Sequence, residues 1–382
     1  FQDGIARSPE AATSLGLDKG KLAHLRGQLS PATAAERQAD LARDRRWRAR
    51  VEAVNPAGLT AAGKRNRALA LYMMDQRITA PARFELDSVQ RPYRIFQQGG
   101  AYFRVPDFLN SQHPVTTVDD AEAYLSRLSA FAGRLDEDTA EQRAQSERGF
   151  TAPGWSLDLT LGQMAKLRGP AAADSGLVKS LADRARAKGL PGDWAARAAN
   201  IVESAVYPAL DRQIALLTEL RRTTPAGDGA WRLPRGEEIY AAALQQATTT
   251  SMTPEQVHQA GLDQVADISA QLDEILKGAG LTQGGVGERL TALNQRPEQL
   301  YANTAAGRKE LIDSLNAGMA AMWERLPKAF ADIPRQPLEI RAVPAEIQDG
   351  ASNGYYNRAS LDGSRPAIYW INLKDVGDWP KY

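Results

Sequence analysis

The segment Thr253–Gly278, TPEQVHQAGLDQVADISAQLDEILKG, decides the fold class of this chain. Thr253 stands at the position of a helix N-cap, Pro254 at the first helical position and Gln256 three residues after the cap, as in a capping box. Apolar residues then recur every three or four positions, and Gly278 supplies a C-terminal stop. The pattern predicts a long amphipathic helix with the apolar positions Val257, Leu262, Val265, Ile268, Leu272, Ile275 and Leu276.

Helical periodicity also dominates the rest of the chain. Helices are predicted at Glu36–Val54, from Thr117 onward through the acidic pair Asp119 and Asp120, at Asp193–Arg222, and from about Ala305 to Phe330. Acidic residues in a first turn favour the helix because they face the positive end of its dipole. Long helices joined by short polar turns predict a body that is mostly α and bundle-like.

Strand signals are few and short. Alternating or apolar runs occur near Tyr102, at Leu338–Val343 and at Ala367–Leu373, and the last of them is the strongest. The predicted fold is therefore mostly α, with a large helical body over residues 1–335. A strand and loop segment over residues 336–382 is expected to hold a small β-sheet near the C-terminal end.

Composition narrows the function classes. Among 382 residues, 47 Lys and Arg balance 46 Asp and Glu, which gives a net charge of +1. This balance argues against a nucleic-acid partner, which needs a surface of one sign. No stretch approaches the roughly 18–20 apolar residues of a membrane span. The chain contains no cysteine and no signal peptide, and a cysteine-free composition suits an exported bacterial protein, so we expect a periplasmic or secreted location.

A catalytic or metal-binding constellation is not predicted within this chain. The three histidines, His24, His113 and His258, lie far apart in sequence and form no zinc-ligand spacing. No G-x-S-x-G nucleophile elbow occurs, and Gly284–Gly287 lacks the preceding strand and following Lys of a phosphate loop. We therefore expect no catalytic residue and no metal site here, and no zinc bound by this chain alone.

The segment Asn353–Tyr382 is different in kind, because rings, amides and a cation gather around one predicted strand. One interpretation is a solvent-facing loop beside a core strand. The other is a recognition edge, at which an exposed strand pairs with an extended peptide. On the second interpretation the substrate-binding residues are Tyr355, Tyr356, Arg365, Tyr369 and Asn372, with Asn357 and Trp370 beside them.

Several stretches together resemble one bacterial family. They are SPEAATSLG (Ser8–Gly16), FRVPDFLNSQHP (Phe103–Pro114), LPRGEEIY (Leu233–Tyr240), TTTSMTPEQVHQAGL (Thr248–Leu262) and YYNRASLDGSRP (Tyr355–Pro366). In this order they are similar to the domain-of-unknown-function family 885, whose members resemble the gluzincin group of zinc metallopeptidases.

The resemblance implies a zinc-dependent peptidase of which this chain is the N-terminal, substrate-side portion. In the family, a helix with an H-E-x-x-H-like zinc motif follows the segment similar to Pro366–Tyr382. Zinc would therefore be bound by a C-terminal part outside this chain, and that part is also expected to cover the terminal strand. The resemblance makes Ile368–Asn372 the substrate-pairing edge and a peptide the substrate. The alternative is a non-catalytic peptide-binding or scaffold protein with the same fold.

Overall fold

The computed structural model describes residues 2–333, 336, 338–343, 352–363 and 365–381. The predicted C-terminal segment 336–382 therefore lies partly outside the described residues. The chain divides into two compact units. Unit 1 comprises residues 1–14 and 18–254, and unit 2 comprises residues 15–17 and 255–382.

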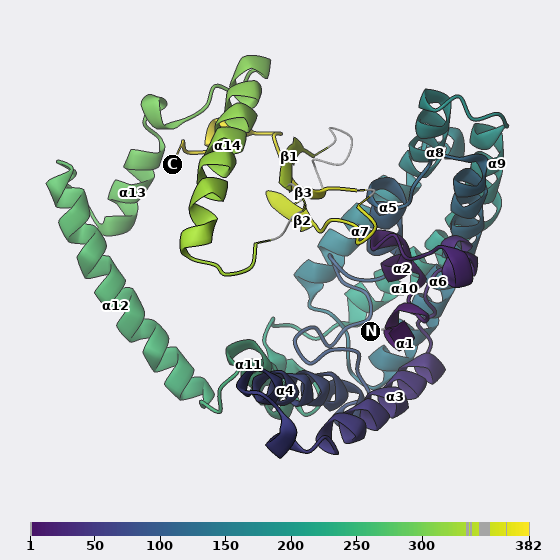
Figure 1. The fold of residues 1–382 in the computed structure, drawn as a ribbon, viewed down its shortest axis with the longest axis horizontal. Helices are drawn as coiled ribbons and strands as arrows, with labels where there is room; N and C mark the ends of the chain where they lie inside the picture. The colour runs from purple at the N-terminus through teal and green to yellow at the C-terminus, as the bar shows by residue number, and fades with distance from the viewer. Residues whose placement is uncertain (1, 334–335, 337, 344–351, 364, 382) are drawn as a thin grey trace. The chain divides into compact units, whose positions relative to one another are not determined.

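Unit 1 is helical (Figure 1). Its α-helices are α1 (Gln2–Ile5), α2 (Pro9–Ser14), α3 (Ala34–Glu52), α4 (Ala61–Arg83), α5 (Ala101–Ser111), α6 (Val118–Glu147), α7 (Gly154–Arg168), α8 (Gly176–Ala187), α9 (Trp194–Ile201), α10 (Tyr207–Thr223) and α11 (Gly236–Thr248). Short 3₁₀ helices are η1 (Gly20–Gly27), η2 (Pro56–Gly58), η3 (Ala172–Asp174) and η5 (Ala230–Arg232), and η4 (Val202–Val206) is a π-helical turn.

Unit 2 combines helices with the three described strands. It contains α12 (Pro254–Gly278, whose first residue still falls in unit 1), α13 (Val286–Asn294), α14 (Ala305–Arg325), the 3₁₀ helices η6 (Pro297–Gln299), η7 (Leu326–Lys328) and η9 (Val376–Asp378), and β1 (Leu338–Ala342), β2 (Gly354–Asn357) and β3 (Ala367–Ile371). The prediction of a mostly α protein with a small sheet near the C-terminal end is confirmed.

The compact units divide at residue 254, whereas the division proposed from the sequence falls at residue 335. The physical reason is a small hydrophobic core in which α14 packs against the strands. Leu311 of α14 lies in this core with Ile340 of β1 and Ile371 of β3. Because their side chains bury one another, the helix and the sheet belong to the same unit.

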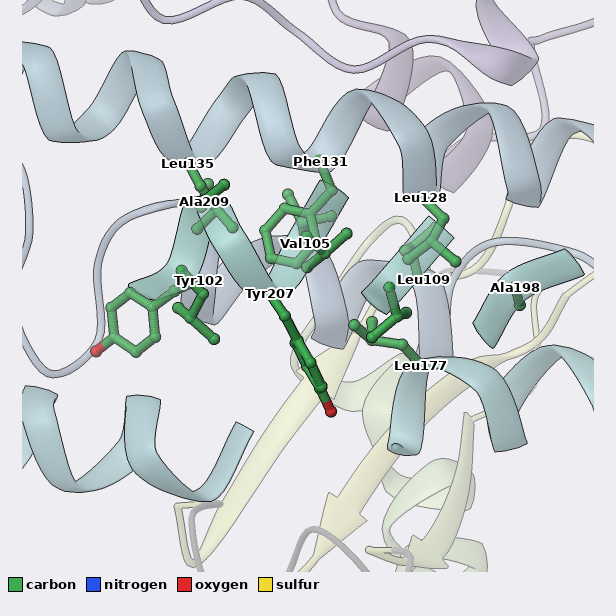
Figure 2. Close-up of a cluster of buried hydrophobic side chains, with 14 of the residues drawn as sticks. Tyr102, Val105, Leu109, Leu128, Phe131, Leu135, Leu177, Ala198, Tyr207 and Ala209 are labelled. Atoms are coloured by element: carbon green, nitrogen blue, oxygen red, sulfur yellow. The ribbon is translucent and has the colours of Figure 1, made fainter. Parts of the chain in front are cut away.

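The main core of unit 1 is formed by the facing sides of α5 to α10. Figure 2 shows Val105 of α5, Phe131 of α6 and Tyr207 of α10 in one cluster of buried side chains. Leu128 and Phe131 are fully buried, which fits their spacing of one helical turn on α6. Burying such a side chain contributes roughly 1.5–3 kcal/mol, so this core supplies much of the stability of the unit.

The predicted long helix at Asp193–Arg222 is present as α9, η4 and α10 in one run. Its middle widens to a π-helical turn, in which the backbone N–H of Tyr207 donates to the carbonyl of Val202. Pro208 follows directly and has no N–H to donate. A wider turn accommodates a proline ring that would otherwise clash with the preceding turn.

The strand expected near Tyr102 is wrong, because residues Ala101–Ser111 form helix α5. Tyr102, Val105 and Leu109 are buried together at helical spacing. The N-terminus of α5 also receives a carboxylate, because the backbone N–H of Ala101 donates to Asp138 Oδ2 over 2.6 Å. This tertiary contact stabilises the helix. The alternation of apolar and polar residues near Tyr102 cannot indicate it, because Asp138 lies far away in the sequence.

A buried guanidinium joins α6 to the start of the chain. Arg127 is fully buried, and its Nε donates to the carbonyl oxygen of Gln28 over 2.8 Å. One terminal nitrogen donates to Thr13 Oγ1 over 2.8 Å and to Leu25 O over 3.1 Å. The other lies 2.7 Å from His113 Nδ1. Burial lowers the pKa of Arg127 to about 10, so the group stays charged at neutral pH.

The partners of His113 fix its protonation state. Arg127 can only donate, so Nδ1 accepts from it, and Nε2 lies 2.9 Å from the carbonyl oxygen of Asp120, which can only accept. The ring is therefore neutral with its proton on Nε2. Burial is the main cause that lowers the pKa of His113 to about 4, and the charges of Arg127 and Arg184 add to it, whereas the contact with the Asp120 carbonyl opposes it.

This state predicts a loss of stability in mild acid. The folded pKa lies below the ordinary value of about 6.5, so the unfolded chain takes up the proton first and stability falls as pH drops from about 6.5 toward 4. At pH 5 the expected loss from this group is about 2 kcal/mol relative to pH 7. Denaturant unfolding at the two pH values measures it. His113→Gln should reduce the difference, and His24→Gln, which changes an exposed ring, should leave it unchanged.

Candidate functional site

The three strands of unit 2 form a mixed sheet in the order β1-β3-β2. β1 runs parallel to β3, and β2 runs antiparallel to it. The expectation that Ile368–Asn372 forms an edge strand is therefore wrong, because β3 has a ladder partner on each side. β2, which the sequence presented as a glycine-punctuated loop, occupies an outer position among the described strands.

The ladder register shows which backbone groups of β2 face outward. The N–H of Asn372 donates to the carbonyl of Asn353 over 2.9 Å, so these two residues form a hydrogen-bonded pair. Along an antiparallel ladder such pairs alternate with non-bonded ones. The backbone of Tyr355 therefore points toward β3, and the backbone of Tyr356 points to the outer edge of the sheet.

Two of the predicted site residues lie opposite each other on the face that also carries Ile371. Tyr356 and Tyr369 are cross-strand partners, and their side chains are 58% and 40% exposed. The ring of Tyr369 covers Gly354, where an added Cβ would lie 2.5 Å from the Tyr369 hydroxyl and 3.0 Å from the Trp370 carbonyl oxygen. Glycine is required there because a side chain would displace the tyrosine.

The other face carries Tyr355. Its ring stacks on Trp370 with centroids 6.2 Å apart and planes at 25°. Across the ladder, Trp370 is paired with Arg341, whose Nε donates to Glu339 over 2.7 Å. Among the described residues, neither the indole N–H of Trp370 nor the amide nitrogen of Asn357 has a hydrogen-bond partner, although both atoms are buried. Buried donors without a partner are rare in folded proteins.

Arg365 and Asn372 lie at opposite ends of β3. Arg365 closes a short loop, since its N–H donates to Ser360 Oγ over 2.9 Å and its carbonyl accepts from the N–H of Ser360 over 3.0 Å. Burial lowers the pKa of Arg365, and the charge of Asp362 opposes this shift. Asn372 Oδ1 accepts from the N–H of Lys374 over 3.0 Å. The structure thus gathers the three tyrosines on the sheet and gives Asn372 a turn-forming contact.

The described residues do not fit a zinc site. No group of three or more histidine, aspartate or glutamate side chains lies close enough together to hold a metal within the part of the chain that the structure describes. His24 contacts the carbonyl of Lys21, and His113 is held by Arg127 and Asp120. We therefore assign no chemical step to a metal bound by these residues.

A second candidate site, which the sequence analysis missed, lies in unit 1. It is a cavity of about 490 Å³ with a largely aromatic and aliphatic wall. The half-exposed rings of Trp155 and Tyr240 line it, and Ser156 Oγ donates to Gln97 Oε1 over 2.5 Å beside them. Its lining includes Leu233, Ile239 and Tyr240, which belong to the stretch LPRGEEIY. That stretch was the sequence signal that could have indicated this cavity.

The fold and the sheet define a mostly helical protein with a small mixed sheet that presents aromatic residues. The chain belongs to the family described as "Bacterial protein of unknown function (DUF885)", whose pattern matches residues 9–382. No curated protein matches the chain. Among the described residues, no helix combines the length and apolarity needed to cross a membrane.

One solved structure similar to this chain is "The crystal structure of the putative lipoprotein from Colwellia psychrerythraea". The two share 25% sequence identity with a TM-score of 0.92. The similarity covers 100% of this chain and 66% of that one. The chain described here thus spans slightly less than two thirds of the length of its solved neighbour.

Proposed function

We propose that this chain forms the substrate-side portion of a zinc-dependent peptidase and that residues outside the chain supply the metal site. The observation that carries the proposal is the outward-facing backbone of Tyr356 at the outer edge of β2. An extended peptide can add to such an edge through main-chain hydrogen bonds that do not depend on its sequence. A hydrolase needs this arrangement because it must hold the scissile bond extended and in register.

The side chains of β2 would select what lies beside that edge. Successive side chains of a strand point to opposite faces, so the exposed ring of Tyr356 faces one side and the Tyr355–Trp370 stack faces the other. Both offer apolar contact to alternate side chains of a bound peptide. The indole N–H of Trp370 and the amide nitrogen of Asn357 add donors for a carbonyl oxygen.

The edge-binding mode is tested by a pair of substitutions at one position. Tyr356→Ala removes the ring and keeps the N–H, whereas Tyr356→Pro removes both, and proline is tolerated where an edge N–H faces outward. One hydrogen bond contributes about 1 kcal/mol, so the proline variant should bind an extended peptide roughly fivefold more weakly than the alanine variant. Calorimetric titration measures this. Equal affinity of the two variants would exclude pairing at this edge.

A chelator separates the enzyme from its alternative, a non-catalytic peptide-binding protein. If the protein that includes the proposed metal site is a zinc peptidase, it cleaves peptides, loses that activity when zinc is removed and regains it when zinc is restored. Both the peptidase and the non-catalytic protein would bind a peptide at the outer edge of β2, so binding alone does not separate them. Peptide binding without cleavage in the zinc-loaded protein would favour the non-catalytic alternative.

Arg365 is proposed to bind the carboxylate at the C-terminus of a substrate. Charge-assisted hydrogen bonds contribute about 1.5–3 kcal/mol, so Arg365→Ala should raise KM roughly tenfold or more for peptides with a free C-terminus. Amidated peptides should be unaffected, and Arg358→Ala, at an exposed arginine just after β2, serves as the control. Equal losses on both kinds of peptide would show that Arg365 only organises its own loop with Asp362.

An exported location is part of the proposal. The absence of cysteine suits such a protein, and the solved neighbour carries the description "putative lipoprotein". Fractionation of the source cells, with an antibody raised against unit 1, tests whether the protein leaves the cytoplasm.

A further inference from the structure

Basic residues gather at one end of the hairpin that α3 and α4 form. Residues 45–67 include seven basic residues and one acidic residue, a net charge of +6 (7 − 1), whereas the whole chain carries +1. The two helices pack side by side (Figure 1), and a terminal nitrogen of Arg67 donates to the carbonyl of Glu52 over 2.7 Å. This contact places the end of α3 beside the first two turns of α4, so the cations of both helices lie at the same end of the hairpin.

Acidic residues neutralise only part of this charge. Glu52 and Asp75 both contact Arg48, and Asp3 accepts from the indole N–H of Trp47 over 2.9 Å. Five basic side chains are exposed and form no ion pair within the described part of the chain, namely Arg45, Arg46, Arg50, Lys64 and Arg65. These five cations remain available to an anionic partner.

The tip of the hairpin, residues 53–62, is uncharged and has the sequence AVNPAGLTAA. Val54 in this tip is 43% exposed. The oxygens of its two polar side chains are used internally, since Asn55 Oδ1 and Thr60 Oγ1 each accept from a backbone N–H two or three residues further on. The side chains that the tip presents are therefore mainly apolar, and basic residues follow it on both helices.

A membrane that contains anionic phospholipids matches this arrangement. Elements at a membrane surface place apolar side chains roughly 5–10 Å into the boundary between headgroups and acyl chains, while basic side chains keep their charged ends near the phosphates. A helix rises about 1.5 Å per residue, so Arg50, Lys64 and Arg65 all lie within about 6 Å of the helix ends that flank the tip. Duplex nucleic acid also offers phosphates, but it offers no apolar layer to the tip.

We propose that the tip of the α3–α4 hairpin binds the surface of an anionic phospholipid membrane, with Arg50, Lys64 and Arg65 on phosphate groups and Val54 below them. Each basic residue near such a surface strengthens binding roughly fivefold. Salt weakens this attraction because it screens the charges. The proposal concerns binding at the membrane surface and does not depend on peptide hydrolysis.

Co-sedimentation with lipid vesicles tests the proposal. Vesicles of phosphatidylglycerol and phosphatidylcholine in equal parts should bind the protein at least tenfold more tightly than vesicles of phosphatidylcholine alone. Salt at about 1 M, where the Debye length falls to about 3 Å, should remove most of this difference. The double variant Arg50→Gln, Arg65→Gln should bind the anionic vesicles roughly twentyfold more weakly than the unaltered protein.

A second double variant provides the matched control. Arg143→Gln, Arg222→Gln removes two exposed arginines of α6 and α10 that also form no ion pair within the described residues, so it changes the net charge by the same amount. It should bind the anionic vesicles within twofold of the unaltered protein. Circular dichroism checks that every variant is folded.

The apolar tip is tested by Val54→Ser, which keeps every cation. This variant should bind anionic vesicles roughly fivefold more weakly, because it loses apolar contact, and it should bind heparin as the unaltered protein does. Equal losses in the two double variants, or no preference for anionic vesicles, would overturn the proposal. If Val54→Ser bound the vesicles as tightly as the unaltered protein, and the protein bound heparin or duplex DNA as tightly as the vesicles, the patch would be a general polyanion contact and the membrane proposal would fail.

Discussion

Asp138→Ala is expected to destabilise unit 1 by about 3–5 kcal/mol, since it removes one partner of a buried ion pair. The Asp138 side chain is fully buried, and its Oδ1 accepts from Arg94 Nε over 2.7 Å and from a terminal nitrogen of Arg94 over 2.6 Å. Its other oxygen accepts from the N–H of Ala101. The alanine variant would leave the guanidinium of Arg94 with Asp87 as acceptor for one of its nitrogens only, and it would leave the first N–H of α5 without its acceptor.

Asp136 provides a matched control on the same helix. It forms a two-point ion pair with Arg212, and both side chains are about half exposed. Exposed pairs contribute roughly 0–1 kcal/mol, so Asp136→Ala should change the unfolding free energy little. Denaturant unfolding of both variants, followed by the signal of unit 1, measures the contrast. Similar losses in the two variants would contradict the special role of the buried carboxylate.

The helical content of this chain was predictable because its signals are local. The cap at Thr253 and the spacing that follows it are sequence features, and α12 begins and ends where they indicate. Thr117 likewise caps α6: its side chain accepts from the N–H of Asp120, and the Asp120 side chain accepts from the N–H of Thr117. Such features depend on residues within one helical turn, so no tertiary information is needed to find them.

The errors concern contacts between residues that are distant in sequence. Alternation near Tyr102 indicated a strand, whereas the carboxylate of Asp138 stabilises a helix there. The strand β2 has only four residues, begins with a glycine and follows an asparagine, so it was interpreted as a loop. Without β2, the central strand β3 was taken for an edge. Strand order depends on pairing, which periodicity does not encode.

The candidate site was predictable only in part for the same reason. The sequence gathered Tyr355, Tyr356 and Tyr369 in one segment, but it could not divide them between the two faces of a sheet whose register was unknown. The cavity beside Trp155 and Tyr240 joins stretches that lie far apart along the chain. Apolar periodicity predicted the apolar positions of α12, but a pattern within one helix does not show what covers them.

Arg127→Met is expected to have the other large effect, a loss of about 2–4 kcal/mol of unfolding free energy, because buried acceptors lose their donor. A charged residue is almost never fully buried unless it is paired, and the partners of Arg127 come from α2, η1 and the residues that follow. Methionine fills a similar volume but donates no hydrogen bond. The carbonyl groups of Pro9, Leu25 and Gln28 would then lose the arginine donor, although that of Leu25 would still accept from the N–H of Gln28. A buried acceptor left unsatisfied costs roughly 1–3 kcal/mol.

The loss of stability in Arg127→Met should appear first in the segment that Arg127 contacts. This guanidinium holds the segment that includes Pro9 and Gln28 to α6, together with the Arg26–Asp120 ion pair and the hydrogen bond from Ser126 Oγ to the carbonyl of Gly27. Its loss should therefore speed tryptic cleavage after Lys19 and Lys21 before the rest of unit 1 unfolds. Arg197→Met is the control, because Arg197 makes a two-point ion pair with Glu122 at the surface. Arg127→Lys should also destabilise the unit, since a lysine ammonium cannot reproduce the forked geometry of the guanidinium. If Arg127→Met left both the unfolding free energy and the cleavage rate as they are in Arg197→Met, the buried guanidinium would not be what holds the start of the chain to α6.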